Sequence, residues 1–189
     1  MSAVPFPEMG VFFVSREPVR DPAPIGAFAQ VRTLLEKELP GKTIPGSISS
    51  VSKGGFVIAA CPDGLGRAGE TSLVEVYAYD PVRYQANIVG LVAPPRETPV
   101  HWIARRVNPD AAIACVVDPR VGLASNTEWK ARPKGYWGNA DTLLALGRML
   151  KGHPATAIEG VGLVVVARTP AALVDAVGGA AGESKDATV

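Results

Sequence analysis

Glu97 and His101 are four residues apart at the beginning of a segment with helical periodicity. At this spacing both side chains lie on one face of a helix, close enough to hydrogen-bond. The positive end of the helix dipole favours an ionised carboxylate, which suits Glu97 to act as a general base beside His101. In the alternative interpretation, Glu97 only complements the dipole and His101 satisfies a buried polar neighbour.

Four further polar residues form a candidate substrate-binding set near this pair. Arg96 could clamp a carboxylate or phosphate in bidentate fashion, although an isolated arginine is more often a solvated surface residue. Ser47 and Ser49 stand in a Gly-Ser-Ile-Ser segment whose hydroxyls could donate to an anion, or which could simply be a turn. Asp118 follows an apolar strand and completes the set.

The segments that carry these residues resemble the class II aldolase/adducin family. The family pattern is a Glu and a His four residues apart, an Arg-x-x-Pro-Asp turn, and a strand ending in His-x-His-Pro. This sequence has Glu97 and His101, the turn at residues 106–110, and Val116-Val117-Asp118-Pro119 at the end of the strand. A later Gly-apolar-Arg-Thr block follows Val161, which takes the position of the family's third metal-binding His.

A weaker likeness lies at residues 46–49, where the family has a Gly-Asn-x-Ser phosphate loop and this chain has Ser47 in place of the Asn. The matched blocks cover about residues 25–178 in the family's order and spacing. The match therefore predicts the fold more strongly than any one motif, whereas function does not transfer with the fold.

The resemblance implies a zinc ion held by three imidazoles, which would stabilise an enediolate or carbanion. Valine has no lone pair, so Val116 and Val161 cannot bind a metal, and only Asp118 remains among the three positions. We therefore predict no metal ion and no other cofactor. An open alternative is that Glu97, Asp118 and Glu159 converge on Mg²⁺ or Mn²⁺, which prefer oxygen ligands.

Composition is that of a globular protein of one domain, with 189 residues of which 47% are hydrophobic and 20% charged. The 19 basic and 18 acidic residues are dispersed, which argues against nucleic-acid or membrane partners. No secretory signal is visible, so the default expectation is a cytoplasmic protein. Cys61 and Cys115 have no Cys-x-x-Cys spacing and are expected to be packed thiols.

Periodicity predicts a single domain over residues 1–178, followed by a disordered tail at 179–189. The predicted helices occupy 24–39, 98–107, 140–151 and 170–177, and the predicted strands occupy 47–52, 56–60, 73–79, 111–117, 156–159 and 163–167. Residues 118–139 have no period and are interpreted as a loop that could order over a cleft. Arg105 and Arg106 fall away from the apolar stripe of their helix and are expected to face solvent or an interface. The order of elements indicates a three-layer α/β/α sandwich with a mainly antiparallel central sheet, as the resemblance also implies.

Two functions are compatible with family-like motifs that lack histidines at the expected metal-binding positions. The first is a non-catalytic binding or assembly subunit, as adducin heads use the same scaffold without metal chemistry. The second is a divergent metal-free lyase acting on a small carbonyl or carboxylate compound, with Glu97 as acid/base and Arg96 as anion holder. Such an enzyme would need a replacement for the Lewis acidity of the metal. We favour the first, with a small anionic or carbonyl ligand. The resemblance implies a homo-oligomer, commonly a tetramer, and leaves a mixed oligomer with an active paralogue open.

Overall fold

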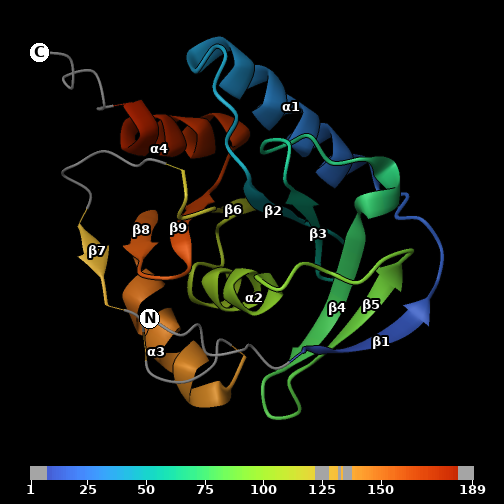
Figure 1. Cartoon of the computed structure of the whole chain (residues 1–189). Helices are drawn as coiled ribbons and strands as arrows, with labels where there is room; N and C mark the ends of the chain where they lie inside the picture. The colour runs from blue at the N-terminus through green and yellow to red at the C-terminus, as the bar shows by residue number, and fades with distance from the viewer. Residues whose placement is uncertain (1–7, 122–127, 132, 134–137, 183–189) are drawn as a thin grey trace, which may run out of the picture.

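The computed structural model describes residues 8–121, 128–131, 133 and 138–182 (Figure 1). In chain order its elements are β1 (Gly10–Ser15), α1 (Pro22–Glu38), β2 (Gly46–Val51), β3 (Phe56–Cys61), η1 (Glu70–Ser72), β4 (Val74–Asp80), β5 (Gln85–Gly90), α2 (Thr98–Val107), β6 (Ile113–Val117), β7 (Trp129–Lys130), α3 (Ala140–Leu150), β8 (Ala155–Ile158), β9 (Gly162–Ala167) and α4 (Pro170–Gly182). None of the helices in this described part has the length and apolarity needed to cross a bilayer.

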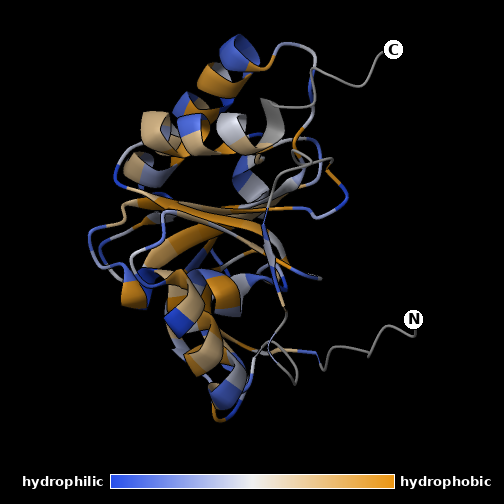
Figure 2. Ribbon diagram, turned by 90° about the vertical axis from the view of Figure 1, so that its left-hand side faces the viewer, coloured by the Kyte–Doolittle hydropathy of each residue, from blue (hydrophilic) through white to orange (hydrophobic). Residues whose placement is uncertain are grey.

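The described strands form one nine-stranded mixed sheet in the order β1-β5-β4-β3-β2-β6-β9-β8-β7. The outermost pairs, β1 with β5 and β7 with β8, are parallel. The pairs between them are antiparallel. Helices α1 and α4 cover one face of the sheet and α2 and α3 cover the other, which gives three layers (Figure 2). The predicted three-layer fold with a mainly antiparallel sheet is confirmed.

Each face of the sheet buries its own apolar core. Successive strand residues point to opposite faces. In β6, Ala114 and Val116 pack in the core under α2 and α3, which we call the α2-side core. Ile113, Cys115 and Val117 pack in the core under α1 and α4, the α1-side core. All residues of β6 are buried, as expected for a strand covered by helices on both sides.

Both cysteines are free thiols on the α1-side core. Burial raises the pKa of Cys61 to about 11. It also raises the pKa of Cys115. A thiol that is buried and protonated near neutral pH is inert, in agreement with the expectation of packed thiols.

Helix α2 begins and ends at local signals in the sequence. Pro99 lies in the first turn, where a helix needs no N–H from it. Thr98 donates its side-chain hydroxyl to the carbonyl oxygen of Pro95. At the other end, the backbone N–H of Asn108 donates to the carbonyl oxygen of Ala104. The bounds of this helix agree with the predicted range 98–107.

Three strands are absent from the sequence-based prediction: β1, β5 and β7. β1 and β7 lie at the sheet edges, and β7 has only two residues inside the stretch interpreted as a loop. β5 alternates buried Ala86 and Ile88 with half-buried Gln85 and Asn87, whose polarity weakens the apolar signal. The rest of the 118–139 stretch lies partly outside the described residues.

Helix α4 continues to Gly182, so the predicted end at Gly178 and Gly179 is wrong, as is a disordered tail over residues 179–182. The helix packs on α1 and buries Leu173 and Val177 in the α1-side core. This packing outweighs the low helix propensity of glycine. Residues 183–189 lie outside the described part.

Candidate functional site

His101 lies on the buried face of α2 and contacts two serines of β2. Its Nε2 atom is 2.9 Å from Ser47 Oγ, and its Nδ1 atom is 2.7 Å from Ser49 Oγ. The serines are two residues apart on the strand, so both hydroxyls point to the same face of the sheet. All three residues are at most 2% exposed. The structure thus brings three predicted site residues together, in the interior of the domain.

Arg105, one turn further along α2, extends this network. Its Nη2 and Nε atoms donate to Ser49 Oγ at 3.1 and 3.3 Å. Its Nη1 atom donates to the carbonyl oxygens of Ala111 and Ala112. Burial lowers the pKa of Arg105 to about 10, so the side chain is still charged at neutral pH. The expectation that Arg105 faces solvent or an interface is wrong, because a serine and two carbonyls compensate its charge between helix and sheet.

The charge on Arg105 fixes the direction of the hydrogen bonds. A guanidinium only donates, and its Nε and Nη2 atoms both donate to Ser49 Oγ, which has two lone pairs, so the hydroxyl proton of Ser49 is the group left to bond Nδ1 of His101. The ring proton is then on Nε2, which donates to Ser47 Oγ. Burial first, and the charge of Arg105 second, lower the pKa of His101 to about 3. His101 is therefore neutral near pH 7, and its protonated Nε2 atom cannot take a proton from Ser47.

Glu97 precedes the first helical residue of α2, and its carboxylate pairs with Arg96. The distance from Arg96 Nε to Glu97 Oε1 is 2.9 Å, with side-chain exposures of 75% and 26%. The backbone carbonyl of Glu97 accepts from the backbone N–H of His101. Both ring nitrogens of His101 are bonded to serines instead of the Glu97 carboxylate. The predicted hydrogen bond between these two side chains is therefore not formed.

Asp118 directly follows β6, and both of its carboxylate oxygens are held by Arg120. The distances are 2.9 Å from Oδ1 to Nε and 2.6 Å from Oδ2 to Nη2. The side-chain hydrogen bond from Arg120 is the main cause that lowers the pKa of Asp118; burial opposes it, and the charge of Arg96 adds to it. Arg96 thus acts on Asp118 as well as on Glu97. We call these four residues, Arg96, Glu97, Asp118 and Arg120, the rim cluster; it contains two carboxylates and two guanidiniums.

Comparisons with known proteins identify the fold. No family model matches the sequence, and no curated protein matches it. Among solved structures, an L-fuculose-1-phosphate aldolase from Thermus thermophilus matches with a TM-score of 0.51 and 22% identity, over 82% of this chain and 86% of that chain. A putative aldolase/epimerase/decarboxylase, YgbL, from Klebsiella pneumoniae matches with a TM-score of 0.57 and 13% identity, over 84% and 85% of the two chains. An aldolase II superfamily protein from Pseudomonas syringae matches with a TM-score of 0.56 and 14% identity, over 86% of this chain and 76% of that one.

The chain has the class II aldolase fold. This agrees with the resemblance seen in the sequence motifs. At identities this low the likeness establishes the fold, and the site has to be judged from its own residues.

In this class II aldolase-like protein, two of the positions expected to bind zinc are hydrocarbon. Val116 is 2% exposed and Val161 is 8% exposed, and both pack in the α2-side core. Val116 stands opposite Ser47 on one side and Val164 on the other. Zinc in proteins is bound by thiolate, imidazole or carboxylate. The residues present therefore do not fit a zinc site.

Imidazoles and carboxylates elsewhere in the part of the chain that the structure describes do not supply the missing ligands. The chain has two histidines, of which His101 is bonded at both nitrogens and His153 is exposed in the turn between α3 and β8. Across the described ranges, no three His, Cys, Asp or Glu side chains are grouped to hold a metal. The alternative site of Glu97, Asp118 and Glu159 for Mg²⁺ or Mn²⁺ is therefore wrong.

Sequence reasoning also missed a contact between two of the family-like turns. Arg168, from the Arg-Thr turn after β9, donates through Nη2 to Asp110 Oδ2 at 2.6 Å. Asp110 ends the Arg-x-x-Pro-Asp turn after α2, and the two residues are 58 positions apart. Spacing along the chain gives no signal for this pair, although each residue belongs to a motif that carried the resemblance.

Proposed function

We propose that this chain is a class II aldolase-like protein without zinc chemistry that acts as a non-catalytic binding or assembly subunit. The observation that carries the proposal is the burial of Val116 and Val161 at two of the expected ligand positions. The third position, Asp118, is engaged by Arg120. A Lewis acid is worth several kcal/mol in the transition state of this type of reaction, and no residue at these positions replaces it.

The metal-free lyase is less well supported by the side chains proposed to catalyse it. A general base must have access to a substrate proton, but Glu97 is paired with Arg96. His101 is neutral and donates to Ser47 and accepts from Ser49, so neither ring nitrogen is available to a substrate. Replacing the metal would require a strong electrophile in the site, and the buried imidazole does not supply one.

The proposed ligand of the subunit is a small anionic or carbonyl compound at the rim cluster, where two guanidiniums lie beside two carboxylates. We also propose a homo-oligomer, which the resemblance implies to be a tetramer, in the cytoplasm. Exposed apolar side chains such as Phe12 and Val14 on β1 support self-association, because such residues are enriched at interfaces. Light scattering of the purified chain, alone and mixed with an active paralogue, tests this part.

Restoring the ligands tests the main proposal. The wild-type chain, purified without chelators, should contain no stoichiometric zinc by elemental analysis. The triple variant Val116→His, Asp118→His, Val161→His should bind one zinc ion, because it supplies three imidazoles at the positions that the resemblance assigns to the metal ligands. The double variant Val116→His, Asp118→His is the matched control and should bind zinc more weakly.

Two results would contradict the proposal or its basis. Stoichiometric zinc in the wild-type protein would show that other residues bind the metal and that the subunit is not zinc-free. A triple variant that is folded by circular dichroism, but binds zinc no better than the double variant, would show that Val161 is not at a ligand position.

A further inference from the structure

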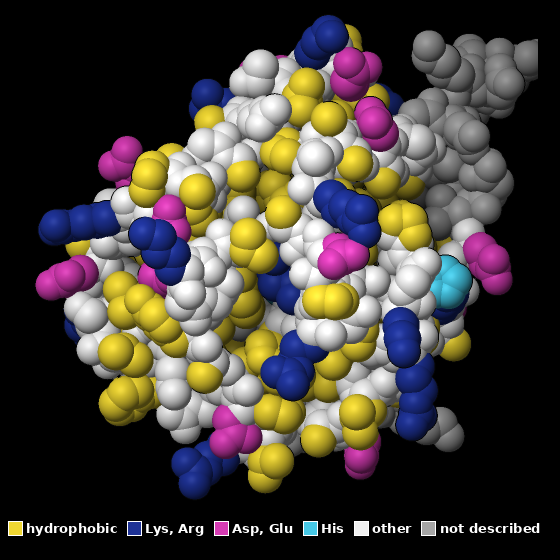
Figure 3. All heavy atoms as spheres, turned by 180° about the vertical axis from the view of Figure 1, so that it is seen from behind, with side chains coloured by type: hydrophobic (Ala, Val, Ile, Leu, Met, Phe, Trp, Pro, Cys, Tyr) yellow, Lys and Arg dark blue, Asp and Glu magenta, His cyan; other side chains and the backbone are white. Residues whose placement is uncertain are grey.

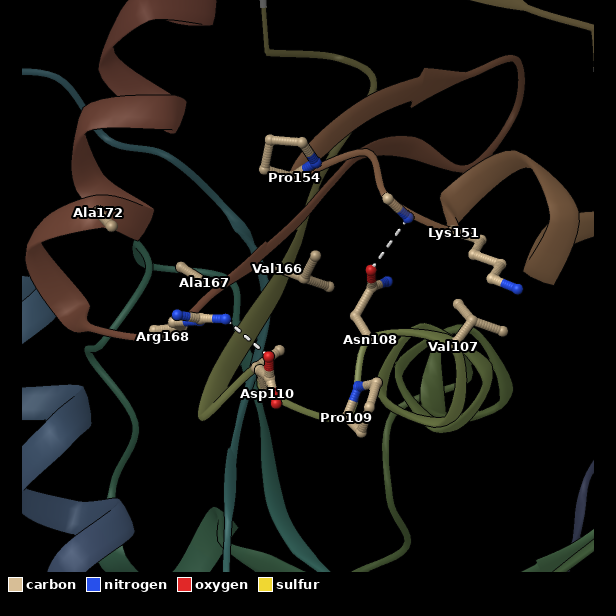
Figure 4. Close-up of a pocket in the computed structure, with 12 residues that line it drawn as sticks. Val107, Asn108, Pro109, Asp110, Lys151, Pro154, Val166, Ala167, Arg168 and Ala172 are labelled. Carbon is tan, nitrogen blue, oxygen red and sulfur yellow. Dashed lines mark hydrogen bonds and ion pairs between the residues drawn. The ribbon is translucent and has the colours of Figure 1, made fainter.

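A separate cavity of about 580 Å³ lies between the end of α2 and the beginning of α4 (Figure 4). Its volume is within the range of small-molecule sites, about 300–1,000 Å³. Ala111, just before β6, lines this cavity. Asp118 of the rim cluster lies just after the other end of β6. The length of this strand, about 16 Å at ~3.3 Å per residue, therefore separates the cavity from the rim cluster.

The walls of the cavity are mainly apolar. Val107 and Pro109 line it from the side of α2, and Ala167 and Ala172 line it from the side of α4 (Figure 4). Val166 of β9, which is 7% exposed, lies between them. A ligand in this cavity would thus place a carbon body between the two helix ends.

One polar side chain at the edge of the cavity is used by the protein itself. The amide of Asn108 donates to the carbonyl oxygens of Ala104 and Leu150, at 3.0 and 3.2 Å. Its Oδ1 atom accepts from the backbone N–H of Gly152 at 3.3 Å. Asn108 therefore ties α2 to the end of α3 and is not a ligand-binding group.

Arg168 is the polar group best placed to bind a ligand. Its Nη2 atom pairs with Asp110, and a guanidinium has five N–H donors, so donors are left for a second acceptor. Lys151 lies at the opposite edge and its side chain runs away from this pair (Figure 4). The charge next to a ligand at this end of the cavity is therefore set by the Arg168–Asp110 pair, and the guanidinium N–H groups that Asp110 does not use are the donors for an anionic acceptor. Seen from behind, Lys and Arg side chains are spread among hydrophobic and acidic ones over this face of the molecule (Figure 3).

We propose that this cavity binds a small organic monoanion: Arg168 holds its carboxylate, and its apolar body lies against Val166 between α2 and α4. The planar guanidinium matches carboxylate geometry, and the apolar walls favour a carbon skeleton over inorganic anions. The inference is independent of whether the rim cluster binds a ligand or catalyses a reaction.

Titration of the full chain with 2-naphthoate, and with its neutral isostere 2-naphthamide, tests the charge requirement. Naphthoate should bind with a stoichiometry of one, and naphthamide more weakly by about tenfold or more, the usual effect of one charge-assisted hydrogen bond. Arg168→Gln should weaken naphthoate binding by a similar factor and remove the preference for the anion. Arg67→Gln is the matched control, because Arg67 also forms an exposed surface ion pair, with Glu36, outside the cavity.

A second pair of variants tests the location. Ala172→Phe fills the cavity and should abolish binding of both compounds, whereas Ala171→Phe, at the neighbouring exposed position, should leave binding unchanged. Surface ion pairs contribute little to stability, so Arg168→Gln should still fold. Absence of naphthoate binding, equal affinity for the two compounds, or equal effects of the Arg168 and Arg67 variants would each overturn the proposal.

Discussion

Lowering the pH from 7 to 5 should destabilise the domain through His101. The pKa of His101 is about 3 in the folded protein, against 6.5 for an unperturbed histidine. Because the folded pKa is the lower one, the unfolded chain takes up this proton first as the pH falls. The contribution of His101 to stability is therefore fully present above pH 6.5 and is lost as the pH falls toward 3. Each pH unit in that window costs about 1.4 kcal/mol, which gives a loss of about 2 kcal/mol at pH 5.

Urea denaturation at pH 7, 6 and 5 measures this loss, which is a large part of a typical unfolding free energy of about 5–15 kcal/mol. The variant His101→Gln can still hydrogen-bond Ser47 and Ser49 but does not titrate, so its stability should change less over the same range. His153→Gln is the matched control and should keep the wild-type slope, since His153 is exposed. Asp118 titrates below the pH range of this assay, because its pKa is held below its usual value of 3.8. Its contribution to the free energy of unfolding is therefore lost only at lower pH.

Equal pH dependence of the wild-type and His101→Gln proteins between pH 7 and 5 would refute the reasoning. Should the variant fail to fold, nitrogen NMR of the wild-type imidazole gives an independent answer. The spectrum should show a neutral ring protonated at Nε2 that does not titrate above pH 5. A ring protonated at Nδ1 would mean that the inferred direction of the Ser49 and Ser47 hydrogen bonds is wrong.

Three further substitutions probe the network and the rim cluster, with Ser50→Ala as the control for Ser49→Ala. Ser49→Ala leaves Nδ1 of His101 without its donor and Nε of Arg105 without its acceptor, although Arg105 keeps the carbonyl oxygens of Ala111 and Ala112, and should cost about 2–4 kcal/mol of unfolding free energy. Ser50→Ala removes one longer hydrogen bond to a carbonyl and should cost less than about 1 kcal/mol in the same urea assay. Arg120→Gln should change stability by less than about 1 kcal/mol, because Arg120 is exposed, while raising the pKa of the Asp118 carboxylate toward its usual value, which NMR titration can follow. An unchanged carboxylate pKa would argue against the bidentate pair.

Sequence periodicity was sufficient for central elements such as α2 and β6, and insufficient for the edge strands β1 and β7 and for β5, which lies next to β1. Helix α2 and strand β6 bury one face or both, so their side-chain pattern follows directly from packing. β1 and β7 lie at the edges, where burial constrains the sequence least. The end of α4 depends on packing against α1, a contact between segments far apart in the chain.

The same division applies to the candidate site. The spacing of Glu97 and His101 correctly placed both residues at the start of one helix, but spacing does not show what lies opposite. His101 hydrogen-bonds Ser47 and Ser49 because β2 lies beneath α2. The Glu97 carboxylate pairs with its neighbour Arg96. Partners that come from other elements, such as the serines here, are set by tertiary structure and cannot be read from one segment.

The side chains at positions 116 and 161 also affect the stability of the folded chain. A fully buried valine contributes about 1.5–3 kcal/mol through the hydrophobic effect, whereas a buried imidazole without metal or hydrogen-bond partner costs free energy. In the proposed zinc-free subunit, Val116 and Val161 are therefore more stabilising than histidines at the same positions would be. It follows that the triple-histidine variant should unfold at lower temperature than the wild-type chain in EDTA and recover stability when zinc is added. The wild-type unfolding temperature should not respond to zinc, and a response equal to that of the variant would mean that the metal binds elsewhere.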